Sequence, residues 1–184
     1  MSNKEKTERV RQALAQLLAL KSNQVSRIAW RMVGGNEALA KDVIQDACVR
    51  CIEEAAQLRD LDAFDSWFFR ILINCAHNRH RRHQTLNRAK ALFSQEPRPD
   101  REPTNLPDHG LQRRIRDALW TLRRSQREAF ILVRLERLSV GESAAIMKVS
   151  EQAIRNHLHR AEQALKRELG DLQEKDRERT AADE

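Results

Sequence analysis

Residues 138–160 constrain the fold more than any other stretch of the chain, because they read as two short helices joined by a tight turn. Ser139 followed by Glu142 is a capping-box pattern, in which the two residues satisfy each other's free backbone amides at a helix start. The turn falls at Lys148, and Ser150 offers its hydroxyl as the N-cap of the next helix. The stretch therefore predicts a helix-turn-helix.

The second helix of this pair has two chemically different faces. Its apolar residues recur at helical spacing and predict a core-facing stripe: Ile154, Leu158, Ala161, Leu165 and Leu169. Another face carries side chains that can donate to base edges and phosphates: Gln152, Arg155, Asn156, His159 and Gln163, with Arg160 at their margin. A solvated amphipathic helix at the end of a bundle would show the same two faces. The capped pair of helices favours a helix that enters the DNA major groove.

Composition favours a helical protein with a polyanionic partner. The chain has 184 residues, enough for two small domains, with five glycines, four prolines and no tyrosine. Its 34 lysines and arginines outnumber 27 acidic residues, and the net charge of +7 favours a polyanion such as nucleic acid. No apolar run approaches the length of a membrane span, and the first residues do not form a signal peptide. We therefore expect a cytoplasmic, all-α protein.

The cysteines are predicted to be core residues. Cys48 and Cys51 form a C-x-x-C motif, which can indicate zinc or redox chemistry, but only Cys75 and His77 are plausible as further zinc ligands. Both motif cysteines also belong to a helical apolar stripe: Ala40, Val43, Ile44, Ala47, Cys48, Cys51, Ile52 and Ala55. Free cysteine in such a stripe acts as a small hydrophobic residue. We therefore expect no metal and no cofactor.

The N-terminal part of the chain predicts two helices, over residues 7–20 and 25–33. Gly34 and Gly35 would end the second one, since glycine accepts the left-handed backbone of a helix cap.

Asn36 is the expected N-cap of a longer third helix, over residues 37–58. The face opposite its apolar stripe is mostly acidic: Asp42, Gln45, Asp46, Arg50 and Glu53. Because phosphates repel carboxylates, this face indicates a protein partner with basic residues.

A fourth predicted helix begins near Phe64 and is basic along its length. No acidic residue occurs from Ser66 to Gln95. The cations of this stretch are Arg70, Arg79, Arg81, Arg82, Arg88 and Lys90. Histidines at 77, 80 and 83 are spaced so that they turn away from one another around the helix, so we do not expect them to bind a metal. Most aromatic residues here should pack in the core. The cations beside a polar loop fit single-stranded DNA.

The helix-turn-helix stretch resembles region 4 of the extracytoplasmic-function sigma factors of bacterial RNA polymerase. The resemblance is carried by L-S-x-x-E-x-A-x-I-M-x-V-S-E-x-x-I-R-N-x-L-H-R-A. Lys148 stands where the family usually has glycine in the turn. By this resemblance the −35 promoter element would be read by Gln152, Arg155, Asn156, His159 and Arg160.

Two further motifs resemble region 2 of the same family. Residues 42–46, D-V-I-Q-D, are similar to the D-V-V-Q-[DE] that docks on the polymerase, which implies core-polymerase contacts at Asp42, Gln45 and Asp46. Residues 67–82 are similar to W-L-F-R-I-A-x-N-x-x-x-D-x-x-R-R, which captures and melts the −10 element, with Asn78 replacing the frequent aspartate. The implied −10 residues are Trp67, Arg70, Asn74, Asn78, Arg79, Arg81 and Arg82. The loop before Trp67 would receive a flipped base.

The motifs imply an all-α chain of two small helical domains joined by a flexible linker. A region 2 bundle would occupy residues 1–86, a proline-containing linker residues 87–110, a region 4 helix-turn-helix domain residues 111–171, and a polar tail residues 172–184. Ser125 with Glu128 is a second capping-box pattern and is expected to open the helix beneath the helix-turn-helix.

The ordered set of motifs predicts an alternative sigma factor that gives core RNA polymerase its promoter specificity and performs no covalent chemistry. The alternative is a stand-alone helix-turn-helix repressor or activator, which would leave the acidic helix face without a purpose. The expected partners are bacterial core RNA polymerase and promoter DNA. An anti-sigma factor is common in the family, but no residue of this sequence identifies one.

Overall fold

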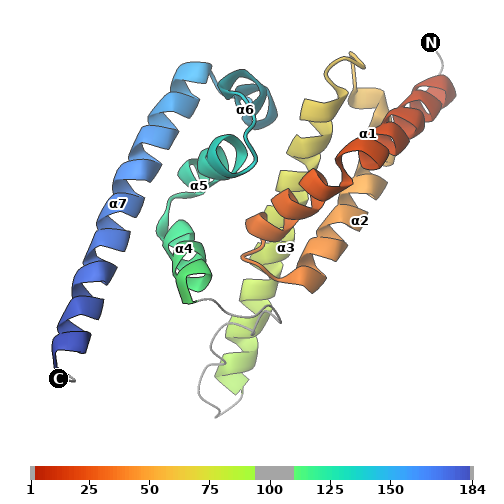
Figure 1. Ribbon diagram of the computed structural model, residues 1–184. Helices are drawn as coiled ribbons and strands as arrows, with labels where there is room; N and C mark the ends of the chain where they lie inside the picture. The colour runs from red at the N-terminus through yellow and green to blue at the C-terminus, as the bar shows by residue number, and fades with distance from the viewer. Residues whose placement is uncertain (1–2, 94–109, 183–184) are drawn as a thin grey trace. The chain divides into compact units, whose positions relative to one another are not determined.

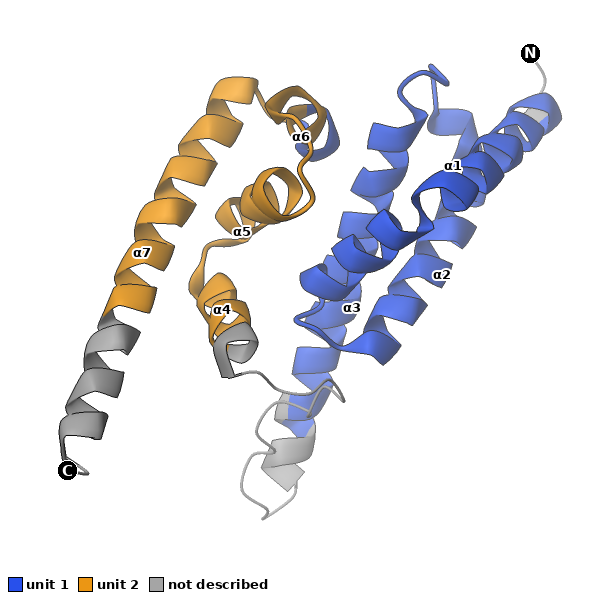
Figure 2. Ribbon diagram, viewed as in Figure 1, with its two compact units in different colours: residues 1–105, 145–148 blue, residues 106–144, 149–184 orange. Residues whose placement is uncertain are grey.

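The computed structural model describes residues 3–93 and 110–182, and within these ranges it contains helices and no strands. The chain divides into two compact units, residues 1–105 with 145–148 and residues 106–144 with 149–184 (Figure 2). The all-α class predicted from the sequence is confirmed. None of the helices in the described ranges is long and apolar enough to cross a membrane.

The first unit is built mainly by α1 (Asn3–Met32), α2 (Glu37–Glu53) and α3 (Phe64–Phe93) (Figure 1). Each packs against the other two, and a 3-10 turn (Ala55–Gln57) follows α2. The core takes one stripe from each helix, with Ile28 from α1, Val43 from α2 and Phe68 from α3 completely buried. Burying side chains of this size contributes roughly 1.5–3 kcal/mol each.

Helix α1 covers both of the N-terminal helices that the sequence predicts. A break at Lys21, where φ is −125° and ψ is 17°, separates its two halves. The Lys21 ammonium pairs with the Asp65 carboxylate, with 2.6 Å between Nζ and Oδ2. The break therefore lies where α1 is tied to the first turn of α3.

The predicted stop and start signals after α1 are confirmed. Gly34 and Gly35 have φ values of 76° and 87°, and the Gly35 amide donates to the Trp30 carbonyl at 2.9 Å. The Asn36 side chain then accepts a hydrogen bond from the Leu39 amide at 2.8 Å. Glycine accepts the left-handed backbone without steric cost, and asparagine supplies the N-cap that α2 needs.

The start of α3 is an aromatic cluster. Phe64, Trp67, Phe68 and Phe69 are all buried, and the rings of Phe64 and Trp67 have centroids 6.0 Å apart. The helix continues through Phe93, so the part of the predicted linker from residue 87 to 93 is helical. This difference arises because residues 87–93 contain no proline or glycine that would end a helix. Residues 94–109 of the predicted linker lie outside the described residues.

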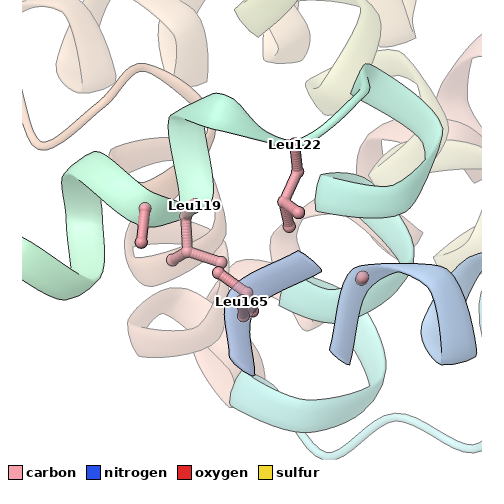
Figure 3. Packing of buried hydrophobic residues seen from close by; sticks show 5 residues of the cluster. Leu119, Leu122 and Leu165 are labelled. Atoms are coloured by element: carbon pink, nitrogen blue, oxygen red, sulfur yellow. The ribbon is translucent and has the colours of Figure 1, made fainter. Parts of the chain in front are cut away.

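The second unit contains α4 (Gly110–Thr121), α5 (Arg124–Phe130), a π-helical turn (Ile131–Leu135), the part of α6 (Val140–Met147) before residue 145, and α7 (Glu151–Ala182). Both α4 and α5 pack against α7. Figure 3 shows Leu119 and Leu122 meeting Leu165 in a core cluster that also includes Ala118 and Ala161. The apolar stripe predicted for the second helix of the helix-turn-helix therefore forms the core of this unit.

The predicted capping box of Ser125 and Glu128 is wrong. Helix α5 begins at Arg124, so Ser125 is already inside its first turn. The cap is made two residues earlier, where the Gln126 side chain accepts a hydrogen bond from the Arg123 amide at 3.3 Å. Glu128 is buried and pairs instead with Arg124 at 2.7 Å.

The polar stretch after Gly170 differs from its prediction as a tail. Helix α7 continues through Ala182, so residues 172–182 are helical and only residues 183 and 184 lie outside the described residues. Mixed charges at helical spacing permit such an extension.

Lys148 adopts φ of 54° in the turn between α6 and α7, a conformation that costs a side-chain-bearing residue about 1–2 kcal/mol. Glycine would relieve this strain, but it also makes the unfolded chain more flexible, which favours unfolding by about 0.4–1 kcal/mol. The net effect of Lys148→Gly should be a rise of about 0.5–1 kcal/mol in the free energy of unfolding. Urea denaturation followed by circular dichroism measures this gain. Lys148→Ala is the matched control, since it removes the charge and keeps the backbone strain. Equal gains in both variants would assign the effect to charge and contradict the backbone explanation.

Candidate functional site

The helix-turn-helix is built by local hydrogen bonds that the sequence predicts. The Ser139 amide donates to the Glu142 carboxylate at 2.7 Å, and the Glu142 amide donates to the Ser139 hydroxyl at 3.1 Å. The Ser150 hydroxyl accepts from the Ala153 amide at 3.2 Å and starts α7. These reciprocal bonds satisfy backbone donors that a helix start leaves free, so both helices of the motif begin where the sequence places them.

Helix α7 buries one face and exposes the other. Ile154, Leu158, Ala161 and Leu165 are buried. The predicted base-reading side chains are all exposed: Gln152, Arg155, Asn156, His159 and Arg160. Because the buried stripe fixes the rotation of α7, these donors and acceptors project together from the second helix of the motif.

The exposed side chains of α7 are held by bonds between successive turns. Arg155 pairs with Glu151 at 2.7 Å, and Gln152 donates to the Asn156 side-chain oxygen at 3.3 Å. The His159 ring lies 3.0 Å from the Gln163 amide nitrogen. Such exposed i,i+4 contacts contribute only a few tenths of a kcal/mol, about 0.2–0.5 each. A nucleic-acid ligand can therefore replace them at little cost.

The residues predicted for −10 contact occupy different environments on α3. Asn74, Asn78, Arg81 and Arg82 are exposed, whereas Arg70 and Arg79 are half-buried. Burial lowers the pKa of Arg70. Trp67 is only 6% exposed and packs in the aromatic core, so its ring supports the start of α3.

A cavity of about 330 Å³ lies in the first unit beside the loop that precedes α3. It is lined by Lys6, Arg9 and Val10 of α1 and by Ala55, Leu58, Arg59, Asp60 and Leu61. Val10, Ala55 and Leu58 are buried and provide an apolar wall. Cations next to such a wall suit a ligand with an apolar ring and a negative charge.

The predicted polymerase-docking residues share the outward face of α2. Gln45 and Asp46 are exposed and Asp42 is half-buried. Arg79 of α3 reaches this face: its Nη2 lies 2.6 Å from Asp46 Oδ2, and its Nη1 lies 3.6 Å from Asp42 Oδ2. A residue predicted for DNA is therefore paired with two residues predicted for a protein partner.

Sequence reasoning missed two features of this face. Val49 lies one turn after Gln45 and Asp46 and is 56% exposed, so the face carries an apolar side chain beside its carboxylates. Its spacing from Asp42 and Asp46 could have placed it there. The second feature is the pairing of Arg79 with Asp46 of α2. These residues are 33 positions apart, so no local sequence pattern predicts the contact.

The cysteines lie in the apolar interior. Cys51 and Cys75 are buried and Cys48 is half-buried, and all three are free thiols. Burial is the main cause that raises the pKa of Cys51, to about 12. Among the described residues, no group of three His, Cys, Asp or Glu side chains is placed to hold a metal ion. The cysteines therefore pack as small hydrophobic residues.

Comparison with known proteins matches both halves of the chain to one family. Residues 19–85 match Sigma-70 region 2, and residues 112–165 match Sigma-70, region 4. The chain is 31% identical to the RNA polymerase sigma factor CarQ of Myxococcus xanthus, over 88% of this chain and 91% of CarQ. It is 30% identical to the ECF RNA polymerase sigma factor SigM of Mycobacterium tuberculosis, over 88% of this chain and 80% of SigM.

The fold is shared with a solved structure. The sigma factor RpoE from Bartonella quintana, in complex with the anti-sigma factor NepR, has a TM-score of 0.60. The similarity covers 85% of this chain and 96% of RpoE at 23% sequence identity. With two matched regions in family order and relatives aligned over most of its length, this chain belongs to the extracytoplasmic-function sigma factors, the sigma-70-family proteins that direct bacterial RNA polymerase to promoters.

Proposed function

We propose that this sigma factor divides promoter recognition between its two helical parts. Residues 1–86 bind core polymerase and the −10 element, residues 111–171 read the −35 element, and residues 87–110 connect them. Residues 172–184 follow as an extension. The family matches to residues 19–85 and 112–165 support this division. The observation that carries the proposal is the exposed polar face of α7, presented by a capped helix-turn-helix.

The −35 element is read by α7 in the major groove. Arg155 and Asn156 are the side chains best suited to base edges, because arginine bonds guanine and asparagine bonds adenine through paired hydrogen bonds. Gln152, His159 and Arg160 flank them and reach neighbouring bases or phosphates. On binding, Arg155 gives up its ion pair with Glu151 and contacts the DNA instead. The ion pair is exposed and therefore weak, so breaking it costs little.

The −10 element is held in the first part of the chain. Asn74, Asn78, Arg81 and Arg82 are exposed on α3 and suit the bases and backbone of a separated strand. The loop before Trp67 receives a flipped base, a role that the adjoining 330 Å³ cavity supports through its apolar wall and its cations. Trp67 and Arg70 act by holding the start of α3, in line with their burial.

Core polymerase docks on the acidic face of α2. Asp42, Gln45 and Asp46 offer carboxylate and amide oxygens to basic residues of the partner, and Val49 adds an exposed apolar contact. An acidic face is unsuited to phosphates, so a protein partner accounts for it best.

The chain itself performs no covalent chemistry, because nucleotidyl transfer belongs to the polymerase. Sigma factors are generally non-catalytic regulators of that enzyme. This chain acts in the cytoplasm, where the polymerase transcribes DNA. An anti-sigma factor is a further proposed partner, since the similarly folded RpoE was solved in complex with one.

The proposal is tested by core-dependent transcription. The purified chain and bacterial core polymerase are mixed with a pool of genomic promoter fragments, and start sites are mapped. We expect initiation at a few sites that share spaced −35 and −10 elements, and none without the chain. Gel shift is the companion measurement: duplex binding by the chain alone, without initiation, would favour a stand-alone regulator and contradict the proposal.

Replacing Asp46 by arginine should weaken binding to core polymerase by at least tenfold. The change removes a carboxylate from the docking face and sets a like charge against basic residues of the partner, a juxtaposition that costs several kcal/mol. Fluorescence anisotropy of a labelled chain titrated with core measures the affinity. Glu8→Arg is the matched control, because it makes the same charge change at an exposed site on α1. Unchanged affinity in Asp46→Arg would refute the docking assignment.

Replacing Arg155 by alanine should relax sequence preference at one position of the −35 element, at a cost of roughly 1–3 kcal/mol. The measurement is holoenzyme binding to promoter variants that differ at each −35 base pair. Lys166→Ala is the control on the same helix, where an exposed cation lies outside the proposed reading face. A uniform loss across all variants would make Arg155 a phosphate contact.

A further inference from the structure

Arg79 connects α3 to the acidic face of α2. Its Nε and Nη2 lie 3.1 Å and 2.6 Å from Asp46 Oδ2, and its Nη1 lies 3.6 Å from Asp42 Oδ2. From this geometry we infer that Arg79 is a positioning residue for polymerase docking and does not contact the −10 strand. The inference rests on the proposed function of Asp42 and Asp46, and it corrects the role that the motif resemblance implies for Arg79.

All three guanidinium nitrogens of Arg79 are turned toward α2. Its side chain is 33% exposed, whereas Arg81 and Arg82 are exposed and form no ion pair within the described residues. A phosphate would have to displace Arg79 from two carboxylates, but it could bind Arg81 and Arg82 directly. Among the α3 cations whose side chains the structure describes, Arg81 and Arg82 are therefore the ones available to a phosphate.

Arg79 places a cation between the two carboxylates. Asp42 and Asp46 are four residues apart on one helix, where like charges repel and push side chains into other rotamers. Arg79 offsets this repulsion: it orients the Asp46 carboxylate by two hydrogen bonds and lies within ion-pair distance of Asp42. It engages only Oδ2 of each, and a carboxylate accepts at both oxygens. A basic residue of the partner can therefore bind Oδ1 of either aspartate without displacing Arg79.

Pre-orientation improves binding because less side-chain freedom is lost on docking. Asp46 and Arg79 are part-exposed, with 47% and 33% of their side chains accessible. Pairs of this kind contribute modestly, so loss of Arg79 should weaken core binding by about two- to fivefold. This loss is smaller than the one expected for a direct contact such as Asp46.

Two affinities of the Arg79→Ala full-length chain test the inference. The first is the affinity for core polymerase, and the second is binding of the assembled holoenzyme, at saturating core, to a single-stranded −10 oligonucleotide. We expect the first to fall about two- to fivefold and the second to stay unchanged. Arg81→Ala is the matched control. It should leave the affinity for core polymerase unchanged and weaken binding of the holoenzyme to the −10 oligonucleotide. Unchanged core affinity with weaker oligonucleotide binding in Arg79→Ala would overturn the inference.

Asp46→Ala separates failure of this inference from failure of the proposed docking face. Weaker core binding in Asp46→Ala but not in Arg79→Ala would leave the docking face standing and refute the role of Arg79. Unchanged binding in Asp46→Ala would refute both. If Arg79 acts through the carboxylates, its removal should weaken binding less in the Asp46→Ala background than in the wild type.

A charge swap distinguishes positioning from general support of the fold. Asp46→Arg combined with Arg79→Asp restores an ion pair between α2 and α3, so the melting temperature should return toward the wild-type value. Core affinity should stay low, because the partner now meets an arginine. Recovery of both the melting temperature and core affinity would show that the pair only supports the fold and would overturn the inference.

Discussion

Burial of one face of α7 decides what the second unit can present to another molecule. Ile154, Leu158, Ala161 and Leu165 lie in the core, and the hydroxyl of Ser150 sets where the helix begins. With its start and its rotation both fixed, α7 buries its apolar stripe and exposes the polar side chains from Gln152 to Arg160. The same logic holds in α3, where the aromatic cluster at its start fixes the rotation that exposes the later cations.

The contact between α2 and α3 links two surfaces that a sequence motif treats separately. Arg79 belongs by sequence to the basic helix, yet its guanidinium pairs with the carboxylates of α2. The first unit therefore has a basic stretch with available side chains and an acidic face whose charge is partly balanced from within. The acidic face and the basic stretch therefore lie on adjacent helices and are joined by the Arg79 ion pairs.

The turn between α6 and α7 shows how the fold tolerates a locally unfavourable residue. Lys148 occupies a left-handed conformation that suits glycine, and the cost of about 1–2 kcal/mol is small beside the burial on either side of it. The Lys148 side chain also adds a positive charge to a helix-turn-helix that binds DNA. The geometry of the helix-turn-helix is therefore maintained by caps and core packing, with the turn residue adapting to them.

Local sequence patterns were enough to predict the all-α class, the helix-turn-helix, the caps at Asn36, Ser139 and Ser150, and the exposed face of α7. These features depend on helical periodicity and on side-chain bonds spanning three residues, which are local. Other features depend on contacts between residues that are far apart in the chain. Packing between helices placed Trp67 in the core and paired Arg79 with carboxylates 33 and 37 positions earlier. Such contacts form only when helices pack against each other. A local sequence pattern therefore cannot predict which side chains meet across the interface.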